Sequence, residues 1–202
     1  MNFLAHLYFS DDTLESRLGS IMADFVKGAA AAAPYGPAII TGINRHRAVD
    51  KFTDTHGIVR ASKRLISDSR RRFSGIIVDV CYDHFLARNW ETYSSIELPV
   101  FAQEMYASFR NYSGDLPGTM RQMLRHMIEQ NWLVSYGTTA GIARALDGLS
   151  LRLKRVNTLT GGVEELERNY DVMGAHFHDF FPDLIRYIRE QGSESSSHLL
   201  RR

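Results

Sequence analysis

The sequence contains a single cysteine, Cys81, so no disulfide can form within the chain, in agreement with a reducing compartment. Its apolar neighbours predict a buried structural thiol rather than a nucleophile. No apolar run is long enough to span a bilayer, and the first residues lack the basic start and apolar run of a secretory signal. We therefore expect a cytoplasmic protein that is not associated with a membrane. The net charge of +1 gives no overall attraction to nucleic acid, so no nucleic-acid partner is expected.

The sequence also shows little evidence of β-structure. No segment alternates apolar and polar residues in the manner of a strand, and no repeat or linker divides the 202 residues. Apolar residues recur at helical spacing instead. We therefore expect an all-α fold, with a single helical domain over residues 1–192 and a flexible polar tail over 193–202. The sequence favours no particular oligomeric state.

The apolar spacing and the turn residues predict where the helices begin and end. We expect helices over residues 13–24, 37–55, 57–70, 74–94, 97–111, 117–133, 138–153 and 161–190. Pro37 suits a first helical turn and Ser74 suits an N-cap, whereas Phe181-Pro182 is expected to interrupt the last helix. Residues 28–37, with five alanines between a glycine and two prolines, are expected to form a loop with at most a helical turn.

The segment 42–56 is the richest in polar groups that bind metals. His46, Asp50 and Asp54 follow one another at intervals of four residues, and His56 lies just beyond. Residues four apart lie on the same face of an α-helix, so these side chains share one stripe. The ordinary explanation of such a stripe is a solvated face with surface pairs. The functional one is a metal site.

A second segment repeats this chemistry with Asp79, Asp83 and His84, in a helix that is otherwise apolar. A buried carboxylate is costly unless it is paired or binds a metal. Imidazoles and carboxylates together suit a hard or borderline divalent cation, which makes bound water more acidic and stabilises charge on a phosphoryl oxygen. The two segments therefore predict a metal-assisted hydrolase built on helices.

Basic residues near these segments suggest a phosphate-containing or acidic ligand. Arg47 follows His46, and Lys27 follows Asp24, so either cation is placed to contact phosphate. The segment 60–72 is more strongly basic, with six cations against Asp68 alone. It is either a solvated helix face or a docking patch for an acidic partner or a phosphate.

Motifs distributed over nearly the whole chain together carry a family resemblance. They occupy residues 1–7, 24–28, 42–43, 46–47, 50, 52–54, 56, 74–75, 79–80, 82–84, 86 and 90. This pattern resembles the acyl carrier protein phosphodiesterases, also called acyl-carrier-protein hydrolases. One departure is Ala23, where the family pattern has glycine.

The resemblance implies a fold similar to the helical HD-domain phosphohydrolases and a role in fatty acid and lipid metabolism. It implies manganese-dependent cleavage of the phosphodiester that joins 4′-phosphopantetheine to a serine of holo-acyl carrier protein, with Mg²⁺ or another divalent ion as alternatives. The implied metal ligands are Asp24, His46, Asp79 and Asp83 foremost, then His6, His56 and His84.

Catalytic roles beside the metal are implied for Arg47 and Lys27, which would neutralise phosphate charge, and for Asp50. Since acyl carrier protein is acidic, the resemblance also turns part of the basic segment into a docking surface, formed by Arg64, Arg70, Arg71 and Arg72. Two alternatives remain at this point. One is an HD-type nucleotide phosphohydrolase, and the other is a non-catalytic helical module that binds an acidic protein.

Overall fold

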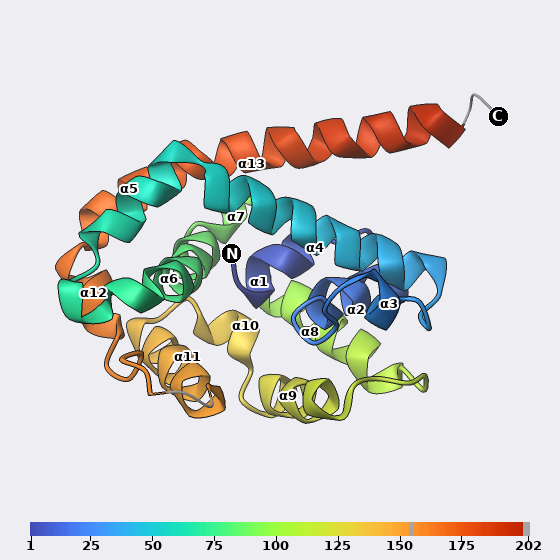
Figure 1. Cartoon of the computed structure of the whole chain (residues 1–202), viewed down its shortest axis with the longest axis horizontal. Helices are drawn as coiled ribbons and strands as arrows, with labels where there is room; N and C mark the ends of the chain where they lie inside the picture. The colour runs from blue at the N-terminus through green and yellow to red at the C-terminus, as the bar shows by residue number, and fades with distance from the viewer. Residues whose placement is uncertain (154–155, 200–202) are drawn as a thin grey trace.

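The computed structural model describes the backbone of residues 1–153 and 156–199, and their side chains except those of residues 29–30 and 192–199. All regular elements in this part of the chain are helical (Figure 1), which confirms the all-α prediction. They are α1 (Phe3–Tyr8), α2 (Leu14–Met22), α3 (Ala29–Ala32), α4 (Pro37–Thr55), α5 (Gly57–Leu65), the 3-10 helix η1 (Asp68–Phe73), α6 (Ser74–Arg88), α7 (Trp90–Tyr93), α8 (Leu98–Asn111), α9 (Gly118–Glu129), α10 (Trp132–Ser135), α11 (Thr139–Arg152), α12 (Val163–Arg168) and α13 (Tyr170–Leu199). None of these helices is long and apolar enough to cross a bilayer.

Capping residues and prolines in the sequence correctly predicted several helix ends. α4 occupies the predicted residues 37–55, and Pro37 lies in its first turn, where its missing N–H costs no hydrogen bond. α2 follows Thr13, whose side chain accepts a hydrogen bond from the N–H of Ser16. α3 is the single helical turn within the predicted loop 28–37. By contrast, α1 was not among the predicted helices.

Three predicted helices are each divided in two. The prediction over 57–70 is wrong beyond Leu65, because Ile66 is extended and η1 follows. The segment 74–94 breaks at Asn89, and 117–133 breaks at Asn131, whose φ of 49° is left-handed. Ser74 is the first residue of α6 rather than its N-cap, which is Phe73.

The last helix corrects the predicted position of a break. The chain breaks at Asn169, between α12 and α13, and Pro182 lies inside α13. Phe181 and Leu184 are fully buried on either side of the exposed proline, so packing holds the helix together although one backbone hydrogen bond is lost. The helical backbone continues through Leu199, and residues 200–202 of the predicted tail lie outside the described residues. The flexibility of 193–202 stays a prediction.

The arrangement of the helices places α1 in the interior. α1 contacts both α2 and α6, while α4 packs against α2 and α13 (Figure 1). α11 packs against α6 and α10. One hydrophobic core runs from Met1 to Ile188 and includes Cys81, which is fully buried as predicted. Burial raises the pKa of the Cys81 thiol, so it remains protonated at neutral pH.

Candidate metal centre

Helix α1 carries His6 into the interior of the molecule. With six residues it is too short to be stable alone, and the side chain of Asn2 at its N-cap makes no capping hydrogen bond. The buried carboxylate of Asp83 on α6 takes this role. It accepts hydrogen bonds from the backbone N–H groups of Asn2 at 3.1 Å and Leu4 at 2.7 Å. Because the free N–H groups of a helix start attract an anion, Asp83 anchors α1 to α6 and thereby positions His6.

Helices α2 and α4 pack in close contact where two glycines meet. A Cβ atom on Gly19 would lie 2.2 Å from a carbonyl oxygen of α4, and one on Gly42 would lie 2.3 Å from the carbonyl oxygen of Ser16. This approach brings the carbonyl oxygen of Ser20 to 2.6 Å from Nδ1 of His46. A carbonyl can only accept a hydrogen bond, so Nδ1 carries a proton, and Nε2 offers its lone pair to a metal ion whenever the ring is neutral.

His6, His46 and Asp50 meet at this point, and each offers a ligand atom within 4.8 Å of the others. One carboxylate oxygen of Asp50 lies 3.3 Å from Nε2 of His6, and the other lies 3.0 Å from Nε2 of His46. The two imidazole rings are stacked, with centroids 3.6 Å apart. Asp24 adds a carboxylate oxygen 3.6 Å from Nε2 of His46. We refer to His6, Asp24, His46 and Asp50 as the cluster.

The charges of the cluster depend on one another. Burial, with the nearby charge of His46, lowers the pKa of His6 to about 3. Burial alone would also lower the pKa of His46, but Asp50 and Asp24 outweigh it and raise that pKa. Burial acts to raise the pKa of Asp50, yet hydrogen bonds from His46 and His6 bring it well below its ordinary value. The cluster therefore favours ionised Asp50, neutral His6 and a positive charge close to His46.

The donor set fits a divalent metal ion. Two imidazoles and two carboxylates are typical ligands of borderline divalent cations, and a bound cation would supply the positive charge that the carboxylates favour. Nδ1 of His6 is buried and has no hydrogen-bond partner in the described part of the chain. Nε2 of the same ring faces Asp50 and lies 3.2 Å from the carbonyl oxygen of Met1, to which it donates when the ring is neutral, so Nδ1 keeps its lone pair.

Asp79, a predicted ligand, lies beside the cluster and contacts it through Met1. Its Oδ1 atom is 2.9 Å from the α-ammonium group of Met1, which is also 3.8 Å from Oδ1 of Asp50. Burial lowers the pKa of this ammonium group, but the two aspartates reverse the effect and raise it. In this structure Asp79 is an ion-pair partner, and its role as a metal ligand stays a prediction.

Three other predicted ligands are not brought to the cluster. Asp83 caps α1, as described above, and lies one turn, or about 6 Å, further along α6 than Asp79. His84 directs Nδ1 to the carbonyl oxygen of Tyr136 at 2.8 Å and Nε2 to the hydroxyl of Tyr170 at 3.1 Å. His56 is the N-cap of α5. Each of these side chains has polar partners outside the cluster, so the two segments predicted from the sequence do not bring all their predicted ligands into one site.

The two cations predicted to bind phosphate are exposed. Arg47 follows His46 on α4, and its guanidinium donates a hydrogen bond to the carbonyl oxygen of Val26 at 3.4 Å. Lys27 has no hydrogen bond or ion pair within residues 1–153 and 156–199. Both side chains are thus available to an anion near the cluster, and their catalytic role stays a prediction.

The four arginines predicted to dock an acidic partner differ in their surroundings. Arg70 is engaged within the fold, since its Nη1 atom lies 3.0 Å from Glu164 and 3.3 Å from the buried Glu165. It therefore ties η1 to α12 and is poorly placed to meet a partner. The remaining three are exposed: Arg64, Arg71 and Arg72.

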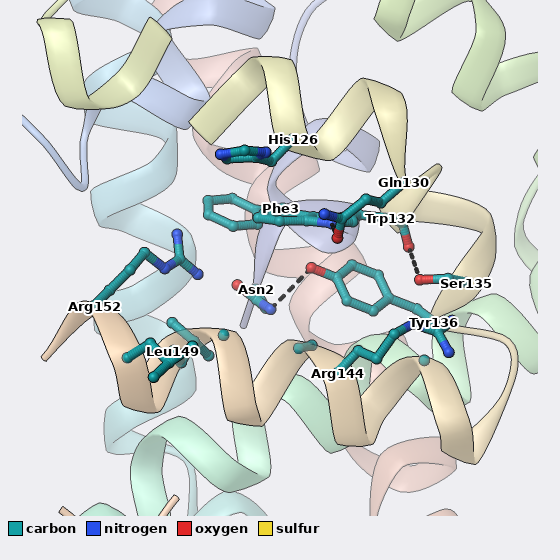
Figure 2. A pocket seen from close by; sticks show the side chains of 14 residues that line it. Asn2, Phe3, His126, Gln130, Trp132, Ser135, Tyr136, Arg144, Leu149 and Arg152 are labelled. Atoms are coloured by element: carbon teal, nitrogen blue, oxygen red, sulfur yellow. Dashed lines mark hydrogen bonds between the residues drawn. The ribbon is translucent and has the colours of Figure 1, made fainter. Parts of the chain in front are cut away.

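A groove of about 310 Å³ opens near the cluster, between α9 and α10 on one side and α11 on the other (Figure 2). The rings of Phe3 and Trp132 stack in it with centroids 6.2 Å apart, and Arg152 lies 5.6 Å from the centre of the Trp132 ring. The hydroxyl of Tyr136 accepts a hydrogen bond from Nδ2 of Asn2 at 3.2 Å. Asn2 and Phe3 directly follow Met1, so the groove borders the region of the cluster.

Sequence reasoning missed this groove and the carbonyl of Ser20 that orients His46. A backbone carbonyl leaves no signal in the residue types. The groove did leave one, because Gly141 and Gly148 lie seven residues apart in a helix rich in alanine and leucine and thus share a face.

Comparison with known proteins bears on this site. A family model described as "Acyl carrier protein phosphodiesterase" matches residues 1–184. Three similar curated proteins carry the same name. That of Photorhabdus laumondii is 36% identical over 92% of this chain and 93% of its own length. Those of Serratia proteamaculans and Yersinia pestis are each 34% identical over 95% of this chain and 99% of their own length. No solved structure matches the chain.

Proposed function

The chain belongs to the acyl carrier protein phosphodiesterase family, and from this premise we propose that it hydrolyses holo-acyl carrier protein to apo-acyl carrier protein and 4′-phosphopantetheine with a divalent cation. Manganese is the proposed ion, with magnesium as the first alternative. The observation that supports the metal dependence is the convergence of two imidazoles and two carboxylates from α1, α4 and the turn that follows α2.

Four side chains would hold the cation: His6, Asp24, His46 and Asp50. A cation bound there would act as a Lewis acid that makes water more acidic and offsets charge on the phosphate. The fold prepares these ligands in advance. The Ser20 carbonyl fixes the proton of His46 on Nδ1, and the Asp83 anchor of α1 fixes the position of His6. Such orientation by neighbouring groups strengthens metal binding and catalysis.

Exposed cations complete the proposed site. Arg47 and Lys27 are near the cluster in sequence and would neutralise phosphate oxygens as the P–O bond breaks. For the acidic carrier protein, the proposed docking surface is formed by Arg64, Arg71 and Arg72, because these side chains are exposed whereas that of Arg70 is not. The cytoplasmic location stays a prediction.

A mass assay tests the reaction and the site together. Purified protein is incubated with holo-acyl carrier protein and Mn²⁺, with and without EDTA, beside the variants His46→Gln and Asp50→Asn. We expect loss of the phosphopantetheine mass by the wild type, abolished by EDTA and reduced at least about 100-fold by either variant. The matched control is His178→Gln, an exposed histidine on α13 outside the cluster, which is expected to retain full activity.

Two results would contradict the proposal. Absence of mass loss with every divalent ion tested would exclude the reaction. Full activity in EDTA, or in both cluster variants, would exclude the metal centre even if the reaction occurs. Isothermal titration with Mn²⁺ adds a measurement without substrate, in which we expect one cluster substitution to weaken binding at least about tenfold.

A further inference from the structure

The groove beside the cluster has two distinct walls. One is aromatic and is formed by the stacked rings of Phe3 and Trp132, together with Tyr136 (Figure 2). The other is a face of α11, on which the lining residues recur at helical spacing of three, four and seven: Gly141, Arg144, Ala145, Gly148, Leu149 and Arg152. A Cβ atom at Gly148 would meet nothing within 4 Å, and Ala145 is small, so this wall leaves room for an elongated ligand.

One end of the groove is formed by Asn2 and Phe3, which directly follow Met1 at the edge of the cluster. Figure 2 shows the guanidinium group of Arg152 at the same end as Asn2, whose neighbour Met1 contacts Asp50. A ligand in the groove can therefore extend from the cluster along α11.

The polar groups of the groove suit a chain that is anionic at one end and carries amides along its length. Arg144 and Arg152 have no carboxylate within salt-bridge distance in the described part of the chain, so both cations are available to a phosphate. Asn2, Gln130 and the hydroxyl of Tyr136 offer amide and hydroxyl partners between the aromatic and aliphatic surfaces. The volume of about 310 Å³ is at the lower end of the range of small-molecule sites.

We propose that this groove binds the phosphopantetheine arm of the substrate, with the phosphate toward Arg152 and the cluster and the pantetheine chain between Trp132 and α11. This inference rests on the proposed function, because that function supplies the ligand. The arm has the chemistry described above, since it joins a phosphate to a chain with two amides and a branched aliphatic group. The groove would then recognise the prosthetic group, while Arg64, Arg71 and Arg72 on the surface would bind the carrier protein.

Gly148 allows a test that leaves the fold intact. A Cβ atom at this position would meet nothing within 4 Å, and the residue lies inside helix α11 on the face that lines the groove. Gly148→Ala adds one methyl group and raises helix propensity, so it is the control. Gly148→Trp projects a large ring into the groove and should block it. Two ligands, 4′-phosphopantetheine and pantetheine, are compared to separate the contribution of the phosphate to binding from that of the pantetheine chain.

The measurement is the affinity of each protein for 4′-phosphopantetheine in Mn²⁺ buffer, determined by isothermal titration. We expect Gly148→Trp to weaken binding at least about tenfold and Gly148→Ala to leave it within about twofold. We expect Arg152→Gln to reduce the preference of the wild type for 4′-phosphopantetheine over pantetheine. Unchanged affinity in Gly148→Trp, or no binding by the wild type, would overturn the proposal.

Turnover of holo-acyl carrier protein is measured separately on the same samples. Binding of 4′-phosphopantetheine that depends on Gly148, without any hydrolysis, would overturn the proposed function and support the groove. Hydrolysis that is equally fast in wild type and Gly148→Trp, with equal affinities, would support the proposed function and overturn the groove. The two proposals therefore fail in different ways.

Discussion

Replacement of Asp83 by alanine tests whether this carboxylate anchors α1 or binds a metal ion. The change leaves the backbone N–H groups of Asn2 and Leu4 without an acceptor in the interior. Each unsatisfied buried donor costs about 1–3 kcal/mol, so the free energy of unfolding should fall by about 2–6 kcal/mol. For a protein of 202 residues each kcal/mol corresponds to about 2–4 °C in Tm, which gives a fall of about 8–16 °C at the middle of that range.

Thermal unfolding followed by circular dichroism in excess EDTA measures this effect without metal. Burial raises the pKa of Asp83 to about 7, although the Met1 ammonium group and the N–H donors of α1 oppose the rise. The measurement should therefore be made at least about one pH unit above this pKa, where the Asp83 carboxylate is ionised in most molecules. The comparison variant is His46→Gln, which removes a cluster ligand and leaves the anchor of α1 in place.

The two variants should behave in opposite ways. Asp83→Ala should lower Tm strongly in EDTA, whereas His46→Gln should mainly remove the rise in Tm that Mn²⁺ produces by binding the folded state. If Asp83→Ala leaves Tm in EDTA unchanged and abolishes the rise caused by Mn²⁺, then Asp83 is a ligand and the reasoning about the anchor is wrong.

Four further substitutions test other parts of the structure. Gly42→Ala places a Cβ atom 2.3 Å from a carbonyl oxygen of α2, so chemical denaturation should show a loss of about 1–3 kcal/mol; equal stability would refute the close packing of α2 and α4. For Glu165, burial raises the pKa, but hydrogen bonds from Ser67 and Arg70 outweigh it and bring the pKa below the ordinary value of 4.5. Its ionised form therefore adds stability above about pH 4.5 that is lost as the pH falls through the folded pKa, so the wild type should lose more stability than Glu165→Gln between about pH 6 and 3 in urea titrations; parallel pH profiles would contradict this. Arg72→Glu should lower kcat/KM for holo-acyl carrier protein without changing Tm, and the effect should shrink at high salt. Arg70→Glu should lower Tm instead, because it removes one of the two arginines that pair with the buried Glu165 and places a like charge beside it, and the reverse pattern in these two variants would refute the assignment of surface and anchor.

Much of the fold followed from local chemistry. Pro37 can begin a helix but cannot continue one, and the apolar spacing after it runs without a break, so α4 was predicted to the residue. The breaks at Ile66 and Asn131 were not predicted, because the amphipathic pattern continues across both residues. The helices end there because of how the chain packs against other elements. Pro182 shows the opposite case, since the buried side chains on either side hold α13 together through a residue that favours a break.

Helical spacing in the sequence was enough to predict one edge of the candidate site. His46 and Asp50 are four residues apart on a helix, so their side chains lie on the same face, and in the structure their nearest atoms are 3.0 Å apart. The sequence also showed that Asp83, inside an apolar helix, needs a partner.

The packing of the helices determines which partner Asp83 has and which residues complete the site. Asp83 and His46 are both predicted metal ligands, yet Asp83 meets the N–H groups of α1, while His46 meets His6 and Asp24. The physical reason is that helical periodicity fixes neighbours within one helix, whereas the groups that satisfy a buried charge come from elements far apart in the chain. Their positions depend on how closely those elements pack, as the contact of Gly19 with α4 shows.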